Sequence, residues 1–181
     1  VYFLLIGVAF LFVEIASIQR FILFLGHPLY AVAVVLAAFL VFAGLGSGAS
    51  TRLARRRPAD TLACAVLAIA VLGMAHVLLL APVFEALGGL AVPAKIALSV
   101  ALIAPLAFAM GMPFSLVLGR IREAMPDFVP WAWGVNGAAS VLAAVLAALL
   151  AMSFGFRAVA LLAILCYLAA AVLGRGIAAP A

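Results

Sequence analysis

The sequence has 181 residues, of which 71% are hydrophobic and 8% are charged, and its mean hydropathy is +1.48. Ordinary soluble domains carry roughly 25% charged residues, so this composition excludes a water-soluble globular protein. A helix that crosses a bilayer needs about 20 apolar residues, and the apolar content is sufficient for six such helices. The composition therefore predicts an all-α, polytopic membrane protein whose main partner is the lipid bilayer.

Six apolar runs follow one another along the chain, separated by short polar or helix-breaking segments. The first run ends at Gly26-His27-Pro28, which combines two helix breakers. The third begins near Asp60, a residue type that caps helix N-termini, and is predicted to stop at Pro82. Residues 1–181 are thus predicted to form a single transmembrane domain. The expected helices are 1–25, 28–46, 60–81, 94–119, 130–152 and 156–173.

Basic residues between the runs predict the orientation of the bundle. The loops after the second, fourth and sixth helices carry seven of the ten Lys and Arg residues, and the opposite side carries three. Cytoplasmic loops are enriched in Lys and Arg, so both termini are predicted to be cytoplasmic. The strongest part of this signal is a basic loop of Arg52, Arg55, Arg56 and Arg57. We interpret the net charge of +5 as a topology signal and predict no nucleic-acid partner.

The start of the chain predicts a longer parent protein. Val1 opens directly on an apolar run without a positively charged segment before it. Such a start does not resemble a cleaved signal peptide. We therefore expect the sequence to be a fragment, with a soluble domain fused or associated before Val1.

Glu14 is the residue whose insertion into a bilayer costs the most free energy. It lies about thirteen residues into the first run, near the expected midplane, where an acidic group costs at least about 2.5 kcal/mol. It is expected to face the bundle interior, where low polarity favours the neutral carboxyl. Two interpretations follow: a proton or cation site, or a hydrogen-bonded pin between helices with Asn136 or Ser17 as partner.

Other polar residues lie within the predicted spans and are candidate sites. Gln19 and Arg20 follow Glu14 near the outer end of the first helix, where an arginine can extend its head group to the interface. Asn136 lies between Gly134 and Gly137, a pattern that predicts a close helix approach. Ser140 lies one turn further on.

His27 and His76 are both expected toward the outer side. Two histidines at similar depth suggest a bis-histidine haem or a quinol site, although a hydrogen-bonded interfacial histidine is the more common outcome. We predict no metal site and no resident cofactor. The segment contains no Ser-His-Asp set and no phosphate-binding glycine loop, so we expect no catalytic residues in it.

Small residues recur at four-residue intervals on two predicted helices. This spacing lets helix backbones approach closely, either inside the bundle or in a homo-oligomer or larger complex. The stripes are Ala139, Ala143, Ala147 and Ala151 on one helix, and Gly111, Ser115 and Gly119 on the other. Two helix ends also look alike at a constant offset of 65 residues, Gly46 and Ser50 against Gly111 and Ser115, each followed by arginines. We interpret this likeness as a shared packing solution.

Two long segments resemble the membrane part of bacterial spermidine synthase-like proteins. They are FLFVEIASIQRFILFLGHPLYAVAVVLAAFLVFAGLGS, residues 10–47, and GMPFSLVLGRIREAMPDFVPWAWGVNGAASVLAAVLAALLAMSFGF, residues 111–156, and together they cover about half of the chain. In that family, a soluble aminopropyltransferase-like domain with a Rossmann-type fold is fused to membrane helices.

The resemblance implies a non-catalytic membrane domain that serves as an anchor, a scaffold or a substrate-channelling unit, located in the bacterial inner membrane. The family's catalytic residues belong to its soluble domain, so no residue of this segment receives them.

Two alternatives remain open. Six helices with both ends inside also match half of a major-facilitator-like carrier. The Gly- and Arg-rich segment 44–57 is similar to a loop motif of those carriers but lacks its acidic residue. The chain could also be an accessory subunit of a membrane redox or photosynthetic complex, in which His27 and His76 would meet haem.

Overall fold

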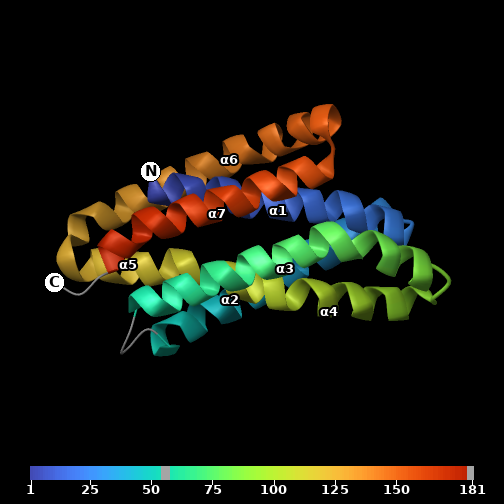
Figure 1. The fold of residues 1–181 in the computed structure, drawn as a ribbon, viewed down its shortest axis with the longest axis horizontal. Coiled ribbons are helices and arrows are strands. Elements are labelled where there is room, and N and C mark those ends of the chain that lie inside the picture. The colour runs from blue at the N-terminus through green and yellow to red at the C-terminus, as the bar shows by residue number, and fades with distance from the viewer. Residues whose placement is uncertain (54–57, 179–181) are drawn as a thin grey trace.

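The structure is a computed structural model that describes residues 1–53 and 58–178. Within these residues it is built from helices and short turns and contains no strand (Figure 1). Six stretches are long and apolar enough to cross a membrane, which confirms the predicted all-α, six-span fold. The elements are α1 (Tyr2–Leu25), α2 (Pro28–Leu53), α3 (Pro58–Leu87), α4 (Val92–Met110), α5 (Met112–Ala124), the 3-10 helix η1 (Pro126–Phe128), α6 (Val129–Phe154) and α7 (Phe156–Ala178).

Several predicted boundaries were wrong, mainly because glycine and proline were taken as terminators. Helix α2 continues past Gly46 to Leu53, so the segment from Gly44 to Leu53 is helical and is not a loop. Helix α3 passes through Pro82 and ends at Leu87. A proline inside a helix frees a carbonyl one turn earlier, which neighbouring groups can satisfy in a membrane bundle.

The fourth predicted helix is in fact two helices. Helices α4 and α5 meet at Gly111, and Pro113 lies in the first turn of α5, where a missing N–H costs no helical hydrogen bond. Together the two helices form one span, Val92–Ala124. Pro105, in contrast, lies inside α4 and does not end it.

Helix α1 is the central element of the bundle. It packs against α6 and α7 on one side and against α2 on the other (Figure 1). Of the residues in its most apolar stretch 61% are buried, compared with 22% for the span that contains α6. The first helix of the chain therefore supplies much of the core.

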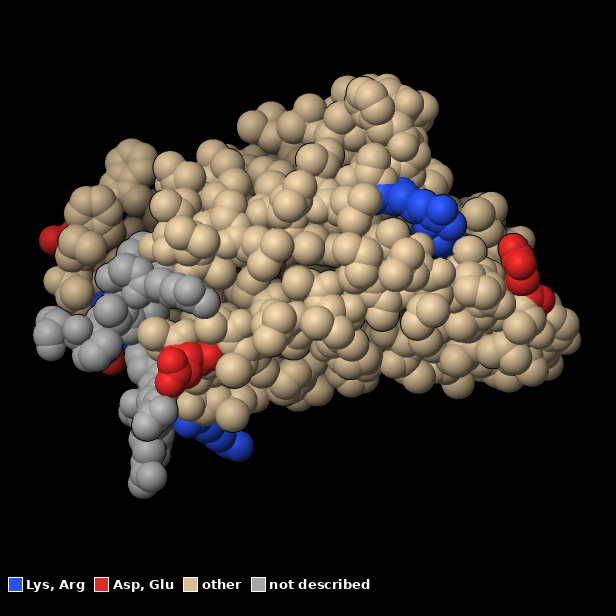
Figure 2. All heavy atoms as spheres, viewed as in Figure 1, with Lys and Arg blue, Asp and Glu red and all other residues tan. Residues whose placement is uncertain are grey.

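Charged and exposed aromatic side chains lie toward the two ends of the bundle. At one end of the bundle, which we call the termini end, α1 begins and α2, α5 and α7 end (Figure 1). The opposite end, which we call the far end, is formed by the turns α1–α2, α3–α4 and α6–α7. Charged side chains on the visible face gather toward these two ends (Figure 2). The exposed Trp131 and Trp133, at the start of α6, suit a membrane interface at the termini end. The cytoplasmic orientation of that end stays a prediction.

The alanine stripe of α6 lies inside the bundle. Ala139, Ala143, Ala147 and Ala151 are all buried, with exposed fractions from 0% to 7%. Because α6 packs against α1 and α7, small side chains on this face let the three helices approach one another. The stripe is thus an internal contact, and its interpretation as an oligomer interface was wrong.

Helices α2 and α4 cross at two glycines that face each other's backbone. A Cβ atom added to Gly46 would collide with the carbonyl oxygen of Phe108, and one added to Gly111 would collide with the carbonyl oxygen of Ala43. The two contacts are reciprocal, because each glycine meets the residue one turn before the other glycine. Only glycine permits this crossing distance.

One turn further on, the hydroxyls of Ser50 and Ser115 form a hydrogen bond of 2.7 Å across 65 residues of sequence. Ser50 is fully buried. The sequence repeat at an offset of 65 is therefore a set of residues in mutual contact, related by a local two-fold arrangement of the two helices.

The Ser50–Ser115 hydrogen bond is expected to contribute about 0.6 kcal/mol, and at most about 1.7 kcal/mol, as such bonds do in membrane proteins. A double-mutant cycle of Ser50→Ala and Ser115→Ala, measured by unfolding of the detergent-solubilised protein in SDS, gives this coupling energy. Ser153→Ala is the control, because the hydroxyl of the exposed Ser153 bonds only within its own helix. A coupling energy of zero would contradict the contact.

Candidate functional site

Glu14 is buried, with an exposed fraction of 7%. Among the described residues its carboxyl forms no ion pair and no hydrogen bond, so neither Ser17 nor Asn136 is the partner that the sequence suggested. Gly7 lies two turns before Glu14 on the same helix face and contacts α6. Glu14 therefore lies on the face of α1 that carries Gly7 and is buried within the bundle, where a neutral carboxyl costs less than a charged one.

Asn136 and Ser140 mark the crossing of α1 and α6. The hydroxyl of Ser140 donates to the carbonyl oxygen of Asn136 at 2.9 Å and approaches that of Gly7 at 3.5 Å. A Cβ atom on Gly7 would lie 2.6 Å from the carbonyl oxygen of Asn136. The predicted close approach is confirmed, but the glycine that it requires is Gly7, since Gly134 and Gly137 face open space. The buried Oδ1 of Asn136 has no hydrogen-bond partner among the described residues.

A cavity of about 40 Å³ lies between α1, α3 and α7 toward the far end. That volume holds a few water-sized groups, since one needs about 10–15 Å³. Its walls are mostly apolar and include four polar residues. These polar residues are Ser17, Arg20, His76 and Arg157.

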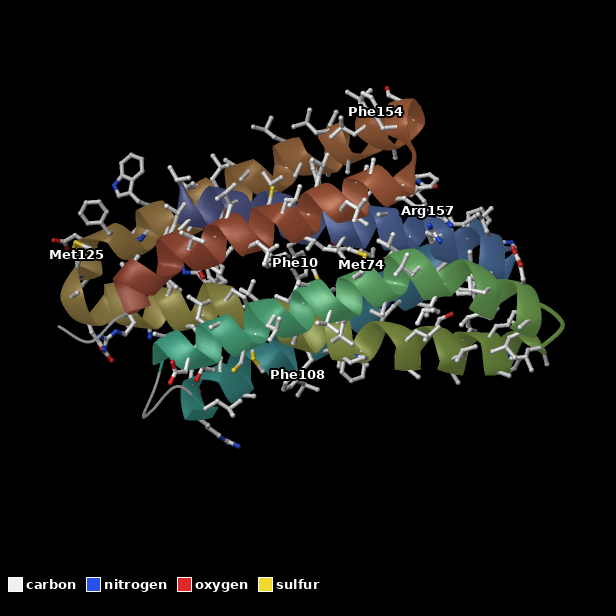
Figure 3. The ribbon with its side chains drawn as sticks, in the orientation of Figure 1. Phe10, Met74, Phe108, Met125, Phe154 and Arg157 are labelled. Carbon is white, nitrogen blue, oxygen red and sulfur yellow. The ribbon has the colours of Figure 1, made fainter. Side chains whose placement is uncertain are left out.

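Arg20 and Arg157 bring two positive charges to this cavity from different helices. Arg20 lies five residues, or about 8 Å, before the end of α1. Arg157 is the second residue of α7, after Gly155, whose φ of 81° and ψ of 159° favour glycine. Figure 3 shows Arg157 where α7 runs alongside α1. Both arginines line the same cavity, and the side chain of Arg157 is exposed whereas that of Arg20 is half-buried.

His76 lines the same cavity and is half-buried. Its Nδ1 donates to the carbonyl oxygen of Leu72 at 2.9 Å, since a carbonyl can only accept. Its buried Nε2 has no hydrogen-bond partner among the described residues. His27, in contrast, is exposed in the α1–α2 turn and its ring lies 5.1 Å from that of Tyr30. The cavity that contains His76 is not lined by His27.

The remaining candidates are exposed or lie outside the described residues. The side chain of Gln19 is exposed and does not line the cavity, although it neighbours Arg20. Arg52 is exposed at the end of α2, and Arg55, Arg56 and Arg57 lie outside the described residues. Among the residues that the structure describes, no three His, Cys, Asp or Glu side chains gather as a metal site would require.

Sequence reasoning missed Arg157 as a site residue and treated it only as a topology charge. A usable signal was present, since Arg157 follows a helix-breaking glycine and is expected at nearly the same depth as Arg20. The pairing itself depends on the rotation of α7 about its axis, which the uniform hydrophobicity of that helix does not reveal.

No protein-family profile, curated protein or solved structure matches this chain. The likeness to spermidine synthase-like proteins therefore depends on the two quoted sequence segments alone.

Proposed function

We propose that the chain is a non-catalytic integral membrane domain, an anchor and scaffold for the soluble enzyme domain of a spermidine synthase-like protein in the bacterial inner membrane. The observation that carries the proposal is that α1 begins and α7 ends at the same end of the bundle, where Arg52 and Arg122 also lie in the last turns of α2 and α5. A domain joined before Val1 would then lie beside the end to which the sequence assigns seven of the ten Lys and Arg residues, as expected for the cytoplasmic side.

The charges of the cavity favour a scaffold over a polyamine channel. Polyamines are cations, so a channel for them needs acidic or carbonyl-rich walls. The cavity instead contains Arg20, Arg157 and His76, and Glu14 does not line it. Cationic walls would repel a polyamine.

The carrier alternative loses one of its supports. The segment from Gly44 to Leu53 is the last part of α2, where Gly46 and Ser50 make helix contacts. The helical conformation of this part of segment 44–57 weakens its likeness to a loop motif of major-facilitator-like carriers.

The parent gene tests the proposal directly. An aminopropyltransferase-like domain is expected upstream of Val1, and a start codon immediately before it would contradict the proposal.

Fusions at the C-terminus test the orientation. A fluorescent-protein fusion is expected to be bright and an alkaline-phosphatase fusion inactive, because the termini end is proposed to be cytoplasmic. The reverse pattern would place the soluble domain on the wrong side.

A further inference from the structure

We propose that a groove between α1, α3 and α4 at the far end binds the zwitterionic head group of a phospholipid, one with a phosphodiester and a primary ammonium group. The phosphate lies between Arg20 and Lys95, and the ammonium group lies against Glu85. The acyl chains stay in the bilayer, so only the head group enters the protein. This site does not depend on any domain that precedes Val1.

The groove has the size and the depth that a head group requires. Its volume is about 410 Å³, within the range of about 300–1,000 Å³ that is usual for ligand sites. Arg20 lies five residues before the end of α1, Glu85 lies two residues before the end of α3, and Lys95 is the fourth residue of α4. At a rise of about 1.5 Å per residue, all three lie within about 8 Å of the far ends of their helices. Lipid head groups lie at this level of a bilayer.

A stacked pair of aromatic rings brings the three charged residues together. The ammonium group of Lys95 lies 5.3 Å from the centre of the Phe24 ring, and Arg20 is one turn before Phe24 on α1. The Phe24 ring stacks on that of Phe84 with 4.4 Å between their centres, and Glu85 follows Phe84 on α3. Two cations and one carboxylate, from three different helices, therefore border the same groove.

The charges of the groove are not paired with one another. Among the described residues, none of Arg20, Glu85 and Lys95 forms an ion pair. The side chains of Arg20 and Lys95 are half-buried, whereas that of Glu85 is exposed. A ligand with both signs of charge gives each of them a charge-assisted hydrogen bond. Two cations suit the two free oxygens of a phosphodiester, and the single carboxylate suits an ammonium group.

The lipid-facing rim of the groove accounts for the acyl chains. Leu23 lines the groove and has an exposed fraction of 78%, so in a bilayer it faces hydrocarbon. The other walls of the groove are apolar and comprise Phe24, Ala81, Phe84, Gly88 and Phe156. A phospholipid can therefore place its head group in the groove while its chains lie against the outer surface beside Leu23. A soluble zwitterion lacks this second contact.

The test uses the full chain in dodecyl maltoside, titrated with dioleoyl lipids and followed by native mass spectrometry. We expect dioleoylphosphatidylethanolamine to bind about fivefold more tightly than dioleoylphosphatidylcholine, whose trimethylammonium group has no N–H to donate to Glu85. Dioleoylphosphatidylglycerol, which has no ammonium group, is also expected to bind less tightly. Glycerophosphoethanolamine, the same head group without chains, is expected to bind much more weakly. Equal binding of the ethanolamine and choline lipids, tightest binding of the glycerol lipid, or equal binding of the chain-free head group would overturn the proposal.

Variants of the groove separate the two halves of the head group. Glu85→Gln is expected to raise the Kd for the ethanolamine lipid about fivefold and to leave that for the choline lipid unchanged. Lys95→Gln is expected to raise both Kd values by a similar factor, because both lipids carry the phosphate. Glu123→Gln is the matched control, since Glu123 is exposed at the termini end. Glu85 is exposed, so its substitution leaves the packed core intact. An unchanged lipid preference in Glu85→Gln, or the same loss in Glu123→Gln, would overturn the assignment of this groove.

Discussion

Gly46→Ala and Gly111→Ala are each expected to lower the free energy of unfolding by about 3 kcal/mol, at the upper end of the range for overpacking. The added methyl group would overlap a backbone carbonyl of the facing helix, that of Phe108 or Ala43. A side chain could rotate away from such a contact, but a helix backbone cannot, so α2 and α4 have to separate. Separation also weakens the Ser50–Ser115 hydrogen bond. The measurement is SDS-induced unfolding of the detergent-solubilised protein.

Other glycines on the same helices are matched controls. Gly44 and Gly48 on α2 and Gly119 on α5 have open space where a Cβ atom would lie. Replacing them with alanine is expected to be neutral or to stabilise by up to about 1 kcal/mol, because alanine has the higher helix propensity. The double variant of Gly46 and Gly111 should lose less than the sum of the single losses, since either methyl group already separates the helices. If Gly46→Ala changes the free energy of unfolding no more than Gly48→Ala does, the close backbone contact between α2 and α4 at Gly46 is contradicted.

Glu14→Leu is expected to raise the free energy of unfolding by about 1–3 kcal/mol, the cost of burying a polar group without a hydrogen bond. Glu14 as a whole is 7% exposed and its carboxyl forms no hydrogen bond or ion pair among the described residues, so the substitution removes a polar group from the interior and no such interaction. The same SDS titration measures the change. Gln19→Leu on the same helix is the control and should have a smaller effect, because Gln19 is exposed.

Glu14→Gln separates a charged carboxyl from a neutral one. A neutral glutamic acid and glutamine are similar in size and polarity, so the stability should change by less than about 1 kcal/mol. A large gain would show that the carboxyl is charged in the folded protein. A loss of stability in Glu14→Leu would instead support the pin between helices that the sequence suggested.

The number of membrane spans and their helical character could be predicted because they follow from hydropathy alone. Runs of about 20 apolar residues have no stable alternative to helix within a bilayer. The ends were harder to predict, as α2 and α3 show. Gly46 suggested a helix end, yet its function is to admit the backbone of α4, and Pro82 is tolerated because an apolar bundle holds the helix together.

The sites depended on which faces of the helices meet, and a sequence this uniformly apolar carries little information about faces. Glu14 was correctly predicted to be interior because of its cost, but its expected partners were wrong. Asn136 and Ser140 correctly indicated a close approach, whereas the glycine that permits it lies on α1. Arg20 and Arg157 line the same cavity because of the rotational orientation of α7 about its axis. That orientation could not be predicted from the sequence and is seen only in the folded structure.

The central position of α1 has a consequence for the order of assembly in the cell. Within this segment α1 is synthesised before the other spans, yet it packs against α6 and α7, which are synthesised after them. Until the α6–α7 hairpin is inserted, the face of α1 that carries Gly7 and Glu14 has only lipid or the insertion machinery beside it. Completion of the bundle is therefore a late, post-insertion event. A chain truncated after α5 would leave Glu14 without the α6 and α7 surfaces that pack against α1, and an unshielded acidic group in a bilayer is costly.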